Sequence, residues 1–322
     1  TSHKKVVNIL CTGYLVAVYI GAIIYCEWFV YYIEPVFWPT IECHTQDTSC
    51  TKIMFIADPQ IQGDYAAPAP FHQLFSWDSD RYLKSTFTVA AQYFKPDVLV
   101  YLGDLMDEGS KSTMQQFHGY AKRLSNIFDL NYTVMVSAHY LGDNDIGGEG
   151  EPVRKDKIAE FNSVFDQPSV LSLHNVTFYK VNAITHTIPD LSERPQPDNN
   201  FKIVVSHYPV TIHSFGYQKV LNIPYSTDTL YEIYVPTCSY RMGTSKIGFG
   251  AAVLDNKTKN LQYTVLWSPT RFPYLIIYLA FVIFLIVYFI IYCAVRLFYA
   301  CSNNITKLAR SSSDRVALLD KV

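Results

Sequence analysis

Residues 97–109 read DVLVYLGDLMDEG, and this stretch decides how the rest of the chain is interpreted. Residues 98–102 form a short, continuous apolar run, which is typical of a strand buried on both faces. The run stops at Gly103 and Asp104. Because α/β sheets bind ligands in the crevice outside the carboxyl ends of their strands, a carboxylate at this position points to a binding site.

The same arrangement recurs along the chain. Three further apolar runs, at residues 52–57, 133–136 and 201–205, lead into polar groups: Asp58 and Gln60, then Asp143, Asn144 and Asp145, then His207. Four strands would thus deliver carboxylates or an imidazole at one edge of a sheet. Oxygen and nitrogen ligands gathered in this way indicate a site for hard metal ions.

The pattern between these runs predicts the remaining elements. Helical spacing of apolar residues predicts helices at residues 80–94, 113–128 and 154–165. Further strands are predicted at residues 178–184, 232–236, 247–254 and 261–267, with a hairpin turn at 255–258. We therefore expect an α/β (α+β) fold in which αβ units and β hairpins form a two-sheet sandwich flanked by helices.

Composition limits the partners and the redox chemistry. The formal net charge of -2 leaves no basic footprint for nucleic acid, so no nucleic-acid partner is expected. The chain has no Cys-x-x-Cys pair, which excludes a zinc ribbon or a thioredoxin motif. Cys43 and Cys50 either close a small disulfide loop in an oxidising lumen or remain free thiols.

The excess hydrophobicity lies at the two ends and predicts a membrane protein. We expect a cytosolic N-terminus at residues 1–5, a transmembrane helix at 6–26, a lumenal domain at 27–271, a transmembrane helix at 272–295 and a cytosolic tail at 296–322. Basic residues flank the outer side of both spans, which favours cytosolic termini. Glycosylation triplets at Asn131, Asn175 and Asn256 agree with a lumenal middle.

The polar positions also carry a family resemblance. Asp58-Pro59-Gln60, Gly103-Asp104, Gly142-Asp143-Asn144-Asp145 and Ser206-His207 follow the order of the metallophosphoesterase signature, which this chain resembles. The strings FIADPQIQGD, YLGDLMDEG and GDNDIGGE resemble its membrane-anchored branch. That branch includes the phosphodiesterase that removes ethanolamine phosphate from glycosylphosphatidylinositol (GPI) anchors. The resemblance implies a metallophosphoesterase-type sandwich across about residues 52–269.

The resemblance assigns a role to each matching position. It implies two divalent metal ions, expected to be Mn²⁺, that bind the phosphoryl oxygens of the substrate. Asp58 then binds the first ion, Asp104 bridges both, and Asp143 stands where the family has an Asn ligand to the second. His207 is the matching His ligand. Asp107 and Asp145 are expected to be supporting carboxylates.

Three departures from the family pattern bear on activity. Gln60 replaces a His ligand, and an amide oxygen is a weaker donor that suits Mn²⁺ or Mg²⁺. Asn144 stands at the catalytic position of the family's acid His, and losing such an acid costs typically about 10²–10⁴-fold in rate. The family's Gly-His-x-His is absent. His213 or His186 would have to supply the missing ligand.

Three interpretations follow. The first is a metal-dependent phosphodiesterase, a phosphoric ester hydrolase acting on a lumenal GPI-type glycolipid or GPI-anchored protein in the endoplasmic reticulum, its exit sites or the Golgi, and so supporting transport between them. The second is a catalytically impaired relative that serves as a lumenal binding or trafficking module. The third is a shortened variant that lacks the Gly-His-x-His segment. Three converging carboxylates favour the first, because they repel one another unless a cation is present.

Overall fold

The computed structural model of the 322-residue chain describes residues 2–42, 50–65, 70–129, 136–148, 150–173, 175–189, 200–208, 220–225 and 231–319. The chain divides into two compact units, Thr1–Thr270 and Arg271–Val322. The first unit contains both sheets, and the second consists of one long helix.

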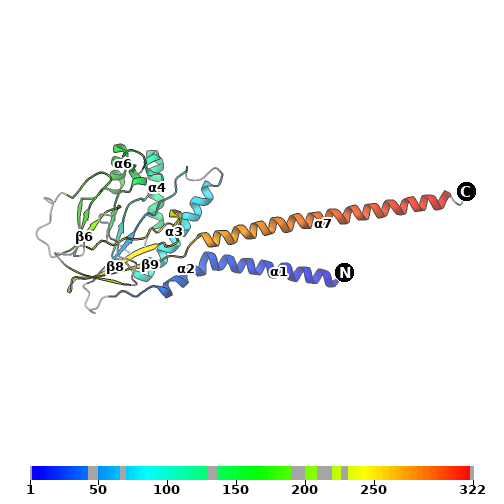
Figure 1. The fold of residues 1–322 in the computed structure, drawn as a ribbon, viewed down its shortest axis with the longest axis horizontal. Helices are drawn as coiled ribbons and strands as arrows, with labels where there is room; N and C mark the ends of the chain where they lie inside the picture. Colours follow the sequence, from blue (N-terminus) through cyan, green and yellow to red (C-terminus); the bar gives the residue numbers. More distant parts are fainter. Residues whose placement is uncertain are drawn as a thin grey trace. The chain divides into compact units, whose positions relative to one another are not determined.

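The larger sheet of the first unit has six strands in the order β3-β2-β1-β8-β9-β7. They are β1 (Cys50–Ile56), β2 (Val98–Tyr101), β3 (Val136–His139), β7 (Leu221–Pro224), β8 (Gly248–Asp255) and β9 (Asn260–Trp267). Strands β1, β2 and β3 run parallel, and β8, β9 and β7 continue the sheet as antiparallel neighbours. Figure 1 labels the adjacent strands β8 and β9. The parallel half therefore brings three carboxyl ends to one edge.

The smaller sheet has the order β4-β5-β6. It consists of β4 (Val170–Leu173), β5 (Val176–Lys180) and β6 (Phe201–Val205). Strands β4 and β5 are antiparallel, whereas β5 and β6 are parallel, with Val176 beside Phe201. The carboxyl end of β6 leads directly to His207.

Side-chain alternation along β1 builds two separate cores. Ile53 and Phe55 belong to a cluster that includes Phe178 of β5 and Tyr263 of β9, so this face of the larger sheet packs on the smaller one. Met54 and Ile56 belong to the other cluster. That cluster holds side chains of three helices, α3 (His72–Phe94), α4 (Met114–Ile127) and α6 (Lys155–Phe165). The unit is thus layered as helices, six-stranded sheet and three-stranded sheet.

This mixed α/β architecture with two sheets and helices agrees with the predicted fold class. The predicted hairpin corresponds to β8 and β9, and all three predicted helices are present with shifted ends. The strand predicted at 232–236 is wrong: these residues are described, but they pair in neither sheet. Ile233 and Val235 still pack against the inter-sheet core, so burial alone gave that segment a strand-like pattern. The predicted strand 133–136 overlaps β3 only at Val136, and residues 130–135 lie outside the described part.

The N-terminal helical segment is longer than the predicted span 6–26. It runs through α1 (Ser2–Ile24), a π-helical turn (Tyr25–Phe29), α2 (Val30–Ile33) and a 3₁₀ turn (Glu34–Phe37). By length and composition, residues 13–37 could cross a membrane. Near its end Tyr31 is buried, with its ring 6.1 Å from that of Tyr82 in α3, and Glu27 pairs with Arg81. This end therefore packs on the folded unit.

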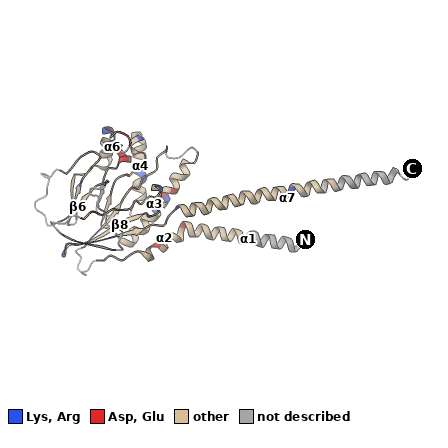
Figure 2. Cartoon of the chain, viewed as in Figure 1, with Lys and Arg blue, Asp and Glu red and all other residues tan. Residues whose placement is uncertain are grey.

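The second unit is the helix α7 (Phe272–Leu319). Its part from Phe272 to Ser302 could cross a membrane by length and composition. Figure 2 shows that this part is almost free of charged side chains, and its single charged residue is Arg296. Two apolar helices, one in each unit, could therefore span a membrane.

The cysteine alternatives are partly resolved. Cys50, at the start of β1, is disulfide-bonded, which agrees with the disulfide interpretation. Cys43 lies outside the described residues. Cys238 is a free, fully buried thiol whose pKa is raised well above its usual range by burial.

A buried ion pair on α6 allows a stability prediction. Lys157 and Glu160 have side chains that are 5% and 8% exposed and lie 2.6 Å apart, and Lys157 also donates to the Ser112 carbonyl. Lys157→Met should lower the free energy of unfolding by about 3 kcal/mol, because it leaves a buried carboxylate unpaired. Lys157→Met with Glu160→Leu should recover most of that loss. Urea unfolding in detergent micelles checks this, and equal losses in both variants would contradict it.

Candidate metal centre

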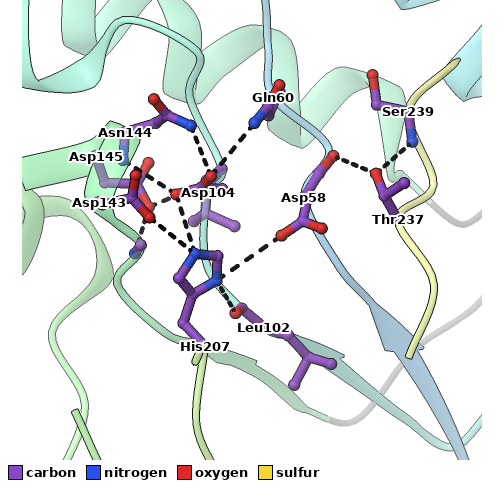
Figure 3. A network of polar contacts seen from close by, with 12 residues as sticks. Asp58, Gln60, Leu102, Asp104, Asp143, Asn144, Asp145, His207, Thr237 and Ser239 are labelled. Carbon is purple, nitrogen blue, oxygen red and sulfur yellow. Dashed lines mark hydrogen bonds and ion pairs between the residues drawn. The ribbon is translucent and has the colours of Figure 1, made fainter. Parts of the chain in front are cut away.

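The described structure brings the predicted site residues together at one edge. Asp58, Asp104 and Asp143 follow the carboxyl ends of β1, β2 and β3, and His207 follows β6 of the other sheet. Figure 3 shows their side chains pointing toward one another, with Gln60 and Asn144 at the border of the cluster. Ligand atoms of Asp58, Asp104 and His207 all lie within 4.8 Å of one another. This geometry can hold a metal ion.

Three residues of the cluster share a strained backbone conformation. Asp58, Gln60 and Asp104 adopt positive φ angles of 47°, 45° and 50°. A non-glycine residue in this region costs about 1–3 kcal/mol, and such strain concentrates at functional sites. The backbone contacts Gln60 N–H to Asp104 O (3.0 Å) and Ile61 N–H to Leu105 O (2.9 Å) hold the two loops side by side. These hydrogen bonds therefore keep the loops that carry Asp58 and Asp104 together.

His207 lies at the centre of the cluster. Its Nδ1 is 3.0 Å from the Leu102 carbonyl, which can only accept, so Nδ1 carries the proton of the neutral imidazole. The lone pair is then on Nε2. That atom lies 3.1 Å from Asp143 Oδ1 and 3.5 Å from Asp104 Oδ1. An ion bound at Nε2 would thus meet two carboxylates at once.

Two amides crowd the carboxylate of Asp104. Its Oδ2 accepts from Asn144 Nδ2 at 2.6 Å and from Gln60 Nε2 at 3.3 Å, and its Oδ1 accepts from the Asn144 backbone N–H at 3.1 Å. These bonds use lone pairs that a bridging ligand would offer to metal ions. The described donors therefore fit one divalent ion better than two.

The pKa shifts at this site reflect burial first and repulsion between the carboxylates second. Burial raises the pKa of Asp58 to about 6. The neighbouring His207 opposes this rise, whereas the carboxylates of Asp104 and Asp143 add to it. Burial also raises the pKa of Asp104. Burial alone would lower the pKa of His207, but Asp104, Asp58, the Leu102 carbonyl and Asp143 raise it overall. Since a divalent cation favours ionised carboxylates, this donor set suits one.

Asp145 holds the loops around the centre through backbone hydrogen bonds. It is fully buried, and its carboxylate accepts from the backbone N–H groups of Met106 (2.9 Å), Gly142 (2.9 Å) and Leu105 (3.2 Å). Burial, with a contribution from Asp104, raises its pKa to about 7, although these hydrogen bonds oppose the rise. Asp145 thus joins the loop after β2 to the start of α5 (Asp143–Ile146). It acts as the supporting carboxylate that the sequence predicts.

Residues 237–241 also contact the site, although no sequence motif predicted this. Thr237 Oγ1 donates to the Asp58 carbonyl at 3.2 Å. Arg241 donates to the Gln60 carbonyl at 3.2 Å and forms an ion pair of 2.6 Å with Asp107. Arg241 therefore ties together the loops after β1 and β2. Its partners are 181 and 134 positions away in the sequence, so local pattern could not reveal this role.

The predicted substitute ligands do not complete the site in the described residues. His186 is exposed in a turn with a φ of 54° and lies outside the metal-binding group. His213 lies outside the described residues. Among the described residues, Asp58, Asp104 and His207 form a group that could hold a single ion. Asp143 lies beside it, 3.1 Å from Nε2 of His207, and the amides of Gln60 and Asn144 lie beside Asp104.

Gly103 gives a test of this geometry. Its φ is +100°, and a Cβ there would lie 2.7 Å from His207 Nδ1. We expect Gly103→Ala to weaken Mn²⁺ binding about 10-fold or more, because the strained, displaced loop moves His207. Gly150→Ala is the matched control, since its φ is +74° but its Cβ would meet open space. Calorimetric titration compares the two, and equal affinities would contradict the assigned contact.

Comparisons with known proteins agree with these features. No protein-family model matches the chain. It is similar to Metallophosphoesterase 1 of Mus musculus (27% identical over 175 residues), of Cricetulus griseus (28% over 175) and of Danio rerio (27% over 178). The matched part is 53% of this chain and 43% or 44% of each relative. The chain thus spans less than half the length of the curated relatives it matches.

Proposed function

Because the chain is a relative of the metallophosphoesterases, we propose that it is a metal-dependent phosphoric ester hydrolase that cleaves a phosphodiester in a lipid-linked substrate. The observation that carries this proposal is the convergence of Asp58, Asp104, Asp143 and His207 around a position for a divalent ion. Three carboxylates from three strands meet there, together with an imidazole from a second sheet.

The residues of this chain have separate tasks in the proposed reaction. Asp58, Asp104, Asp143 and Nε2 of His207 would hold the ion, which supplies Lewis-acid stabilisation of the phosphoryl charge when bound. The Leu102 carbonyl keeps the His207 proton on Nδ1. Asn144 can donate a hydrogen bond to a leaving oxygen, but an amide delivers no proton near neutral pH. The alkoxide that leaves from an alkyl phosphodiester would therefore take its proton from water, which makes such substrates slower than esters of acidic alcohols.

We further propose the finer assignment that the resemblance implies. The ion is Mn²⁺, and the substrate is a GPI-type glycolipid or a GPI-anchored protein that loses ethanolamine phosphate. The resemblance also implies a second ion, for which the described residues do not provide a complete ligand set. The folded unit lies in the lumen of the endoplasmic reticulum, its exit sites or the Golgi, with both termini cytosolic. Two apolar helices that could span a membrane support a tethered site, which raises the effective concentration of a lipid-linked head group.

A separate observation supports a second candidate function. Asn144 and Gln60 both donate to Asp104, an arrangement in which amides satisfy the carboxylate without an ion. This favours a relative that binds a phosphorylated head group in the same crevice without cleaving it.

Hydrolysis decides between the two functions. The full chain in nanodiscs, loaded with Mn²⁺, should release ethanolamine phosphate from a GPI-type glycolipid, and Asp58→Asn should abolish the release. Mass spectrometry of the released head group checks this. Binding of the glycolipid without release would favour the second function.

A further inference from the structure

A cavity of about 260 Å³ with a mixed polar and apolar lining opens beside His207. It lies between residues that follow β3, residues of α6, and residues at or after the ends of β5 and β6. Its lining includes Tyr140, Lys180, Asn182, Thr187 and His207. Since His207 belongs both to this lining and to the candidate metal centre, the cavity adjoins the place where a phosphodiester would bind.

Tyr140 brings a hydroxyl that the described protein does not use. The residue is only 5% exposed, and its Oη is buried with no hydrogen-bond partner among the described residues. Burial raises its pKa, so the group remains a protonated donor. A buried hydroxyl without a partner costs free energy of about 1–3 kcal/mol. An acceptor from a ligand would remove this cost.

Lys180 brings a cation to the ring of Tyr140. Its Nζ lies 5.3 Å from the centre of the Tyr140 ring and 3.3 Å from Gln167 Oε1. Within the described ranges, no carboxylate lies within 4 Å of this ammonium group. Burial lowers the pKa of Lys180 to about 8, although Asp166 opposes the effect. A partly buried ammonium without a carboxylate partner favours an anionic ligand.

We infer that Tyr140 and Lys180 form a subsite for a phosphate group that is distinct from the phosphodiester at the metal centre. The hydroxyl and the ammonium are both donors, and phosphate oxygens are strong acceptors. The inference rests on the proposed function only in assigning this phosphate to the substrate's head group. It predicts a preference for head groups that carry a second phosphate.

Chemical labelling of Lys180 tests the subsite without any hydrolysis. The full chain is treated with acetic anhydride in detergent with inorganic phosphate, and in nanodiscs that contain phosphatidylinositol or phosphatidylinositol 4-phosphate. At about 80% occupancy, labelling of Lys180 should fall about fivefold. Lys202, which is exposed on β6, should be labelled equally in all samples. Protection by inorganic phosphate alone would identify a free-anion site, and protection by the 4-phosphate lipid would identify a head-group site.

Tyr140→Phe keeps the ring and removes only the hydroxyl. It should weaken the protecting anion's affinity about 10-fold, since a hydrogen bond to a charged group is lost. Absence of protection in every sample, or protection unchanged in Tyr140→Phe, would overturn the subsite. Protection without hydrolysis would sink the proposed reaction and leave the subsite intact. Hydrolysis without protection would refute the subsite and leave the proposed reaction intact.

Discussion

Asp104→Asn is expected to lower the affinity for Mn²⁺ by at least about 100-fold and to remove measurable hydrolysis. Replacing groups that merely support metal ligands costs about 10–100-fold, so losing the central carboxylate should cost more. Asp104 is 4% exposed, and its Oδ1 lies 3.5 Å from Nε2 of His207. The variant keeps the size of the side chain but removes its charge.

Asp129→Asn is the matched control for this prediction. Asp129 is exposed after the end of α4, and the substitution is chemically identical. Metal affinity by calorimetry and hydrolysis of bis(4-nitrophenyl) phosphate are measured for both variants of the full chain. If Asp104→Asn retained the affinity of the Asp129→Asn protein, the ion would not bind at Asp104.

Asn144→His is expected to increase activity toward alkyl phosphodiesters by about 10–100-fold. A positioned general acid contributes about 10²–10⁴-fold, and an introduced imidazole should recover part of that. Asn144 already lies beside the centre, with Nδ2 2.6 Å from Asp104 Oδ2. A His side chain there could protonate an alkoxide leaving group, which the amide cannot.

The leaving group provides the control for Asn144→His. A 4-nitrophenolate departs without protonation, so hydrolysis of a nitrophenyl ester should change far less than that of an alkyl ester. Initial rates for the two substrates, measured at the same Mn²⁺ concentration, give the comparison. An equal gain on both substrates would show that the new residue acts through metal binding and not as an acid.

The parallel strands explain how much of the centre could be predicted from sequence. Each ligand follows a short apolar run, and a parallel sheet places the carboxyl ends of such runs at one edge. Asp58, Asp104 and Asp143 could therefore be grouped before the fold was known. His207 comes from the other sheet, and its β6 run carried the same local signal.

Contacts between distant segments explain what the sequence could not predict. Arg241 lies after an irregular segment, and only the folded chain brings it to Asp107 and to the Gln60 carbonyl. The strand predicted at 232–236 failed because a buried segment can show the apolar pattern of a strand without pairing. The amide contacts to Asp104 depend on side-chain orientation, which no spacing encodes.

The most direct measurement is the hydrolysis rate of bis(4-nitrophenyl) phosphate by the full chain as a function of bound Mn²⁺. This substrate needs no acid, so the rate reports on the metal centre alone. The account predicts that the metal-free chain shows no hydrolysis and that the rate rises as the ion binds. Asp104→Asn should lose both the binding of the ion and the hydrolysis. A chain that binds Mn²⁺ at this centre and shows no hydrolysis above Asp104→Asn would contradict it.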